Sequence, residues 1–107
     1  MKLPKSKYWY HATSIDNAQS IIRDGVLKSA WDGIYFANTD KNAGTFCRMR
    51  GLNQWAVIKV PREMIIDKLE RSNDHCFELP AGCHFAVYRG KEIAVNDKMI
   101  NYWEAAE

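Results

Sequence analysis

The chain has 107 residues, of which 47% are hydrophobic and 26% are charged. This composition is typical of one small globular domain and excludes a disordered chain. The 15 basic and 13 acidic residues leave a formal net charge of +2, which is too small to indicate a nucleic-acid or membrane partner by electrostatics alone.

The first part of the chain alternates between strand and helix patterns. The aromatic run YWYHAT (8–13) predicts a strand. A helix follows, which Ser14 or Asp16 can cap and which Gly25 can end. The run GIYFA (33–37) then predicts a short buried strand.

A second helix and a longer strand come next. Residues 41–51 predict a helix that ends at Gly51, although the internal Gly44 lowers the helix propensity. The run QWAVIKV (54–60) has the clearest strand pattern of the chain, and Pro61 is expected to end it.

The last third of the chain is rich in strand patterns. Residues 62–70 fit either a continued strand or a helical turn, and residues 76–90 fit a hairpin. Residues 92–96 predict another strand, and 98–107 a terminal tail that docks through apolar side chains. This order predicts an α+β fold with a mainly antiparallel sheet, because short loops leave little room for parallel crossovers.

The cysteines and the chain's first residues indicate a cellular setting. Cys47, Cys76 and Cys83 are too few, and odd in number, for a disulfide framework. A zinc site built from Cys76, Cys83, His75 and His84 is disfavoured, because adjacent strand residues point to opposite faces. We find no secretory signal and no apolar run near the roughly 20 residues of a membrane helix. We therefore expect reduced cysteines, no metal and a cytoplasmic protein.

Two segments in order, YHATSIDNAQSIIRDGV and DGIYFANTDKNAGTFC, resemble the ADP-ribosyltransferase superfamily. The similarity is greatest to its poly-ADP-ribose-polymerase and diphtheria-toxin-like branch. The shared pattern begins with His11, the small residue Ala12 and Thr13. A helix with a terminal glycine, the glycine-led strand that contains Tyr35, and a helix with a second aromatic residue, Phe46, complete it.

This resemblance covers residues 8–50 and implies a fold. Members of the superfamily hold NAD in a split β-sheet. We therefore expect an ADP-ribosyltransferase-like split antiparallel sheet with short helices, in one domain over residues 1–107.

The resemblance also implies roles in NAD binding. His11 would hydrogen-bond a ribose hydroxyl, and the backbone of Ala12, where relatives have glycine, would bind the nicotinamide amide. Thr13 would bind the ligand or cap the next helix, and we favour capping. Tyr35 would stack on the nicotinamide ring and Phe46 would close its other side. The alternative for each side chain is a structural role in the core or in backbone hydrogen bonding.

Two further positions differ from the pattern of the relatives. Ala43 stands where polymerase-type relatives often place a serine that binds the nicotinamide carboxamide. The catalytic glutamate of relatives opens a late strand, and in HFAVY (84–88) that position is His84. A neutral histidine can accept a hydrogen bond from the ribose 2′-hydroxyl, but it carries no negative charge for the oxocarbenium-like transition state.

A carboxylate elsewhere could replace the missing glutamate. Glu78 is the better candidate, because a hairpin can bring it near His84, and Glu92 is the second. The alternative is that both glutamates are solvated surface acids. Three arginines that could bind phosphate are more simply interpreted as solvated side chains; they are Arg48, Arg50 and Arg89.

The sequence therefore predicts an NAD-dependent ADP-ribosyltransferase that moves ADP-ribose from NAD to a protein or nucleic-acid acceptor, with release of nicotinamide. His84 and Glu78 are the candidate catalytic residues. His11, Ala12, Thr13, Tyr35 and Phe46 are the candidate NAD-binding residues. A non-catalytic NAD- or ADP-ribose-binding module and an RNA 2′-phosphotransferase-like enzyme are the alternatives.

Overall fold

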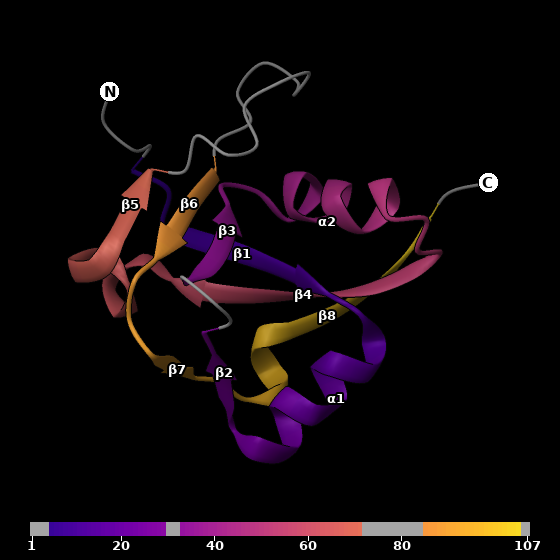
Figure 1. The fold of residues 1–107 in the computed structure, drawn as a ribbon, viewed down its shortest axis with the longest axis horizontal. Coiled ribbons are helices and arrows are strands. Elements are labelled where there is room, and N and C mark those ends of the chain that lie inside the picture. Colours follow the sequence, from indigo (N-terminus) through magenta and orange to yellow (C-terminus); the bar gives the residue numbers. More distant parts are fainter. Residues whose placement is uncertain (1–4, 30–32, 72–84, 106–107) are drawn as a thin grey trace.

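The computed structural model describes residues 5–29, 33–71 and 85–105. As the sequence predicted, they form an α+β domain with antiparallel strand pairing (Figure 1). The strands are β1 (Tyr8–Thr13), β2 (Val26–Lys28), β3 (Ile34–Ala37), β4 (Gln54–Pro61), β5 (Leu69–Arg71), β6 (Phe85–Tyr88), β7 (Glu92–Ala94) and β8 (Ile100–Glu104). Within the described ranges, a six-stranded sheet has the order β5-β6-β3-β1-β4-β8, and β2 pairs with β7 in a separate two-stranded sheet.

The first helix, α1 (Ile15–Asp24), begins and ends where its sequence predicted. The Ser14 hydroxyl accepts a hydrogen bond of 3.2 Å from the Asn17 backbone N–H, which satisfies a donor that the first turn leaves unpaired. Gly25 ends the helix in a left-handed conformation with φ 74°. The N-cap is thus Ser14, so our preference for Thr13 as the cap was wrong. The Thr13 hydroxyl instead accepts a bond of 3.3 Å from the Asn17 side-chain amide.

The second helix, α2 (Asp40–Met49), lies within a residue or two of its predicted bounds. Thr39 is its N-cap and accepts a hydrogen bond of 3.1 Å from the Asn42 backbone N–H. Gly44, which lowers the helix propensity, is buried in the middle of this helix. A Cβ atom at Gly44 would lie 2.7 Å from Trp55 Nε1. The glycine therefore lets α2 pack closely on β4.

We expect the Gly44→Ala variant to be less stable than the wild type, although alanine is the better helix former. The gain in helix propensity is about 1 kcal/mol, whereas forcing a methyl group into a closed contact costs about 1–3 kcal/mol. Urea unfolding of the variant and the wild type measures the difference. A Gly44→Ala protein more stable than the wild type would show that Trp55 moves aside at little cost.

The two helices cover opposite faces of the larger sheet (Figure 1). On the α1 face, the buried core contains Trp9, Phe36 and Ile58 with Ala18 of the helix. On the α2 face, a second buried cluster contains Trp55, Val57 and Phe85 with Ala43 and Cys47. Each helix thus buries its apolar side on the sheet, which makes the larger sheet the central layer.

The later segments resolve what the sequence left open. Residues 62–70 form two single 3₁₀ turns, Arg62–Met64 and Ile66–Lys68, before β5 begins. The terminal tail is more ordered than predicted: after a 3₁₀ turn at Asp97–Met99 it adds β8 to the edge of the sheet. In the hairpin predicted over 76–90, the second strand corresponds to β6. The first strand and the turn lie outside the described residues.

In the larger sheet, β1 and β3 are paired over only part of their length. β1 pairs with β4 along its whole length, whereas β1 and β3 share the single register pair Tyr10 and Ala37. Beyond that pair, Ala12 and Thr13 have described register partners only in β4. Among the described strands, backbone groups on the β3 side of β1 therefore have no strand partner beyond Tyr10, and such groups need another hydrogen-bonding partner.

Candidate ligand-binding site

A cleft of about 780 Å³ occupies the opening between β1 and β3. Its volume lies within the range of small-molecule sites, about 300–1,000 Å³. The NAD-binding residues predicted from the sequence come from three elements, and all of them line the cleft; they are His11, Ala12, Thr13, Tyr35 and Phe46. The start of α1, part of β2 and one side of α2 also contribute to the lining.

His11 joins the two strands across the opening. Its Nδ1 lies 2.7 Å from the backbone oxygen of Tyr35. Because a carbonyl oxygen can only accept, Nδ1 carries the proton and donates it. Nε2 of the neutral ring is then an acceptor. An edge contact between the His11 and Phe36 rings, with centroids 5.9 Å apart, further fixes the imidazole.

The His11 imidazole is held in its neutral form. Burial lowers the pKa of His11, because the charged ring would lose its hydration, and the hydrogen bond to Tyr35 only partly opposes this effect. At neutral pH the one donor of the ring is therefore occupied by the Tyr35 oxygen, and Nε2 is left as an acceptor.

The two neighbouring aromatic residues in β3 point to opposite faces of the sheet, as side chains alternate along a strand. Phe36 is 1% exposed and belongs to the core on the α1 face, as expected. Tyr35 is half-buried and lines the cleft. Phe46 of α2 also lines the cleft, and its ring packs on that of Phe85 with centroids 4.6 Å apart. Phe46 is thus fixed by the neighbouring cluster while it lines the cleft.

One side of α2 faces the cleft. Ala43, Phe46, Cys47 and Arg50 all line it, and their spacing of three and four residues puts them on one helix face. Burial raises the pKa of the Cys47 thiol, while the nearby Arg50 charge lowers it less. The thiol is therefore protonated and is a poor nucleophile at neutral pH.

The arginines considered as phosphate ligands have different places in the structure. Arg50 lines the cleft, and Arg48 is absent from the described lining. Arg89 is paired with Glu70, with Nε and Oε2 2.9 Å apart. The structure also brings Lys28 of β2 to the cleft, so the charged side chains in its described lining are cationic.

The candidate catalytic residues are placed as follows. His84 and Glu78 lie outside the described residues, as do the other members of the disfavoured zinc cluster. Glu92 is exposed in β7 and opposes Lys28 of β2 in register. Across residues 5–29, 33–71 and 85–105, no group of three or more potential ligands is placed to hold a metal ion. None of the described helices has the length and apolar character to cross a membrane.

Several lining residues were not predicted from the sequence, namely Tyr10, Ser14, Asn17, Leu27, Lys28, Gly33 and Cys47. Helical spacing of four residues would have indicated Arg50 from Phe46, and Cys47 from Ala43. No local sequence pattern indicated that Lys28 would line the cleft, because its position depends on the pairing of β2 with β7, which are far apart in the sequence.

Comparison with known proteins leaves the site to be interpreted from its own geometry: neither a family model, nor a curated protein, nor a solved structure matches this chain.

Proposed function

We propose that the cleft binds NAD and that the protein transfers ADP-ribose from NAD to a macromolecular acceptor, with release of nicotinamide. The observation that carries this proposal is the opening between β1 and β3. The side chains that the sequence motif singled out converge on it, although they come from β1, β3 and α2. A strand pair that separates after one register pair makes room for a ligand within the sheet.

The described residues would bind the nicotinamide riboside part of NAD. The His11 ring donates through Nδ1 to Tyr35, so Nε2 is available to accept a hydrogen bond from a ribose hydroxyl. The backbone of Ala12, which has no register partner in β3 among the described residues, would bind the carboxamide. Tyr35 would stack on the pyridinium ring, which favours an aromatic neighbour because the ring is flat and cationic.

In the reaction, the bond between ribose C1′ and the nicotinamide nitrogen breaks, and nicotinamide leaves with the bonding electron pair. A nucleophilic atom of the acceptor forms the new bond to C1′ and gives up its proton. Charge stabilisation at the ribose would come from His84 or Glu78, which remain candidates from the sequence. Ala43 supplies no hydroxyl for the carboxamide, so the backbone contacts would carry more of the recognition.

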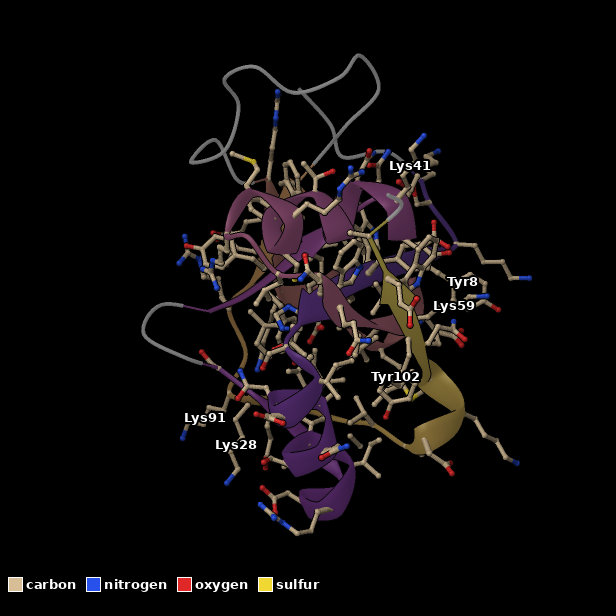
Figure 2. The ribbon with its side chains drawn as sticks, turned by 90° about the vertical axis from the view of Figure 1, so that its right-hand side faces the viewer. Tyr8, Lys28, Lys41, Lys59, Lys91 and Tyr102 are labelled. Carbon is tan, nitrogen blue, oxygen red and sulfur yellow. The ribbon has the colours of Figure 1, made fainter. Side chains whose placement is uncertain are left out.

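We expect the Tyr35→Ala variant to bind NAD about 10- to 100-fold more weakly than the wild type, because stacking on an aromatic side chain contributes about 1–3 kcal/mol. Ligand-observed NMR titration with NAD measures the affinity, and nicotinamide release is followed in the same tube. The matched control is Tyr102→Ala, since Tyr102 is 56% exposed on β8 and is not part of the described lining (Figure 2). Unchanged binding in Tyr35→Ala, or equal losses in both variants, would contradict the assignment.

A second candidate function, a non-catalytic NAD-binding module, is favoured by the cationic character of the described lining. Such a module would bind NAD with the same dependence on Tyr35 and would release no nicotinamide with any acceptor. Loss of release in His84→Ala, with NAD affinity retained, would instead establish turnover at this site.

A further inference from the structure

We propose that a basic strip, where β1 begins and β4 ends, binds single-stranded nucleic acid and presents it to the cleft as the acceptor of ADP-ribose. The basic strip consists of Lys7, Tyr8 and Lys59, with Tyr10 at the end that meets the cleft. The inference deepens the proposed function and rests on it for the transfer step, whereas binding of nucleic acid to the strip can be measured without NAD.

The pairing of β1 with β4 brings the residues of the basic strip together. Tyr10 opposes Lys59 in register, and Tyr8 opposes Pro61. Opposed residues, and residues two apart in a strand, share a face of the sheet. The Lys59 Nζ lies 4.0 Å from the centroid of the Tyr8 ring, and the Lys7 Nζ lies 5.8 Å from it. Two ammonium groups and one aromatic ring therefore form a single cluster.

Tyr10 connects this cluster with the cleft. Its side chain is part of the described lining and packs against the buried cluster on the α2 face. It lies two residues from Tyr8, which is about 7 Å along a strand. A polymer bound to the strip therefore has its next unit beside the opening between β1 and β3. There a nucleophilic atom of the polymer would form the bond to ribose C1′ and lose its proton, as nicotinamide leaves with the bonding electron pair.

The cations of the basic strip are free to meet an anion. Neither Lys7 nor Lys59 forms an ion pair with a described residue. The Arg62 N–H bonds the Lys7 carbonyl at 2.9 Å, which brings a third cationic residue to the same strand ends. A phosphate can therefore bind here without first breaking an internal ion pair.

Two acidic residues belong to the elements that flank the strip. Glu63 follows in the 3₁₀ turn after β4 and is exposed. Burial first, and the nearby Asp40 charge second, raise the pKa of Tyr10, so Asp40 lies toward the cleft end of the strip. Its Oδ1 accepts a hydrogen bond of 2.7 Å from the backbone of the first turn of α2. We therefore expect phosphates beside the two lysines and a base, which carries no negative charge, beside Tyr10.

This combination of groups favours single-stranded nucleic acid over other polyanions. Ammonium groups neutralise backbone phosphates and release their counterions, and aromatic rings beside them can stack with bases, which an acidic peptide lacks. The Tyr8 ring holds the Lys59 ammonium by cation–π attraction, so this cation is in place before a phosphate arrives. In a duplex, a base that reacts in a cleft must first leave the stack, and a single strand avoids that cost.

Fluorescence anisotropy tests binding of labelled single-stranded RNA and DNA to the whole protein at several salt concentrations. We expect Lys7→Gln and Lys59→Gln each to weaken binding about 3- to 10-fold at about 50–150 mM salt. Each should also reduce the slope of log K against log salt by about 0.7, the effect of one lost phosphate contact to a single strand. The matched control is Lys91→Gln, because Lys91 is exposed and lies toward the opposite side of the molecule from Tyr8 and Lys59 (Figure 2). It should bind as the wild type does.

Two substitutions of Tyr8 test whether its ring positions Lys59. Tyr8→Phe keeps the ring and should bind the single strand as the wild type does. Tyr8→Leu removes the ring and should weaken binding about 2- to 5-fold, with the salt slope nearly unchanged because no charge is lost. Urea unfolding of the same samples confirms that each variant is folded. Equal binding by folded Tyr8→Phe and Tyr8→Leu proteins would contradict the positioning role.

Nicotinamide release tests whether the bound strand is the acceptor. The single strand should increase release from NAD in the wild type and increase it less in Lys59→Gln. The affinity for NAD, measured without the strand, should be the same in both proteins. A strand that binds to the strip and leaves release unchanged would contradict its role as acceptor.

The outcomes keep the basic strip and the proposed function distinct. Binding that weakens in the strip variants and not in Lys91→Gln supports the strip even if NAD does not bind, and in that case the NAD assignment alone fails. Three results overturn the strip: no binding of single strands by the wild type, equal losses in strip and control variants, or displacement of the strand by poly-glutamate at equal charge. NAD binding that depends on Tyr35 would then leave the proposed function intact.

Discussion

The Gly33→Ala variant is expected to lose about 2–4 kcal/mol of unfolding free energy, because both its space and its backbone conformation exclude a side chain. A Cβ atom at Gly33 would lie 2.5 Å from Val87 Cγ2 and 2.7 Å from the Tyr88 backbone oxygen. The backbone φ of 153° is one that residues with a Cβ rarely adopt. A backbone oxygen cannot rotate away as a side chain can, so β3 itself would have to shift.

Urea unfolding followed by tryptophan fluorescence measures this loss, with Gly51→Ala as the control. Gly51 also has a positive φ, of 82°, but a Cβ there would meet nothing within 4 Å. The control should therefore show the conformational cost alone, about 1–2 kcal/mol. Equal losses at the two glycines would show that the contact with β6 costs nothing and that our steric argument is wrong.

The structure gives this glycine a packing reason that the sequence does not reveal. Gly33 is the glycine that begins the strand motif GIYFA, two residues before Tyr35 of the candidate site. The structure adds that β6 packs directly on it, through Val87 and Tyr88. Gly33 also lines the cleft, so a shift of β3 at this point would move the strand that carries Tyr35.

Features that depend on neighbouring residues in the chain were predictable. The bounds of α1 follow from Ser14 and Gly25, which act on the helix ends through hydrogen bonds a few residues away. The division between a buried Phe36 and a half-buried Tyr35 follows from strand alternation. The convergence of His11, Tyr35 and Phe46 was expected only through the family resemblance, since their spacing alone does not bring β1, β3 and α2 together.

Features that depend on distant contacts were not predictable. The pairing of β8 with β4 turns a predicted tail into an edge strand, because Ile100 and Trp103 find places opposite Ile58 and Trp55. Lys28 reaches the cleft through the pairing of β2 with β7. Such pairings are chosen by the packing of the whole domain rather than by local propensity.

Two amide substitutions of His11 are expected to separate its structural role from its proposed role in NAD binding. Asparagine can place an amide donor near the position of Nδ1, and so can keep the bond to the Tyr35 oxygen while leaving nothing at Nε2. Glutamine reaches the position of Nε2 and loses the Nδ1 donor. We therefore expect His11→Asn to keep wild-type stability and to bind NAD about 10-fold more weakly.

The opposite pattern is expected for glutamine. His11→Gln should lose about 1–2 kcal/mol of stability, the effect of removing a buried hydrogen bond, and should bind NAD more tightly than His11→Asn does. Urea unfolding and NAD titration on the same samples give both values. A His11→Asn protein as unstable as His11→Gln would show that the bond to Tyr35 does not account for the role of His11 in the fold.

The pH dependence of the wild type provides an independent test of the same histidine. Burial lowers the pKa of His11 in the folded protein, whereas the unfolded chain titrates at about 6.5. The unfolded state therefore binds the proton first as the pH falls. The stability contributed by neutral His11 is complete above that value and is lost as the pH falls toward the folded pKa. The His11→Asn variant has no titrating group at this position. As the pH falls from about 6.5 toward the folded pKa of His11, the free energy of unfolding of the variant should therefore rise relative to that of the wild type.

NAD binding should follow protonation of the same ring. A proton on Nε2 removes the acceptor and puts a positive charge close to the cationic nicotinamide ring, so wild-type affinity should fall as the pH is lowered through the folded pKa of His11. The His11→Asn protein should show little change, because its amide does not titrate. Parallel pH profiles for the two proteins would place the titrating group elsewhere and would remove His11 Nε2 from the ribose contact.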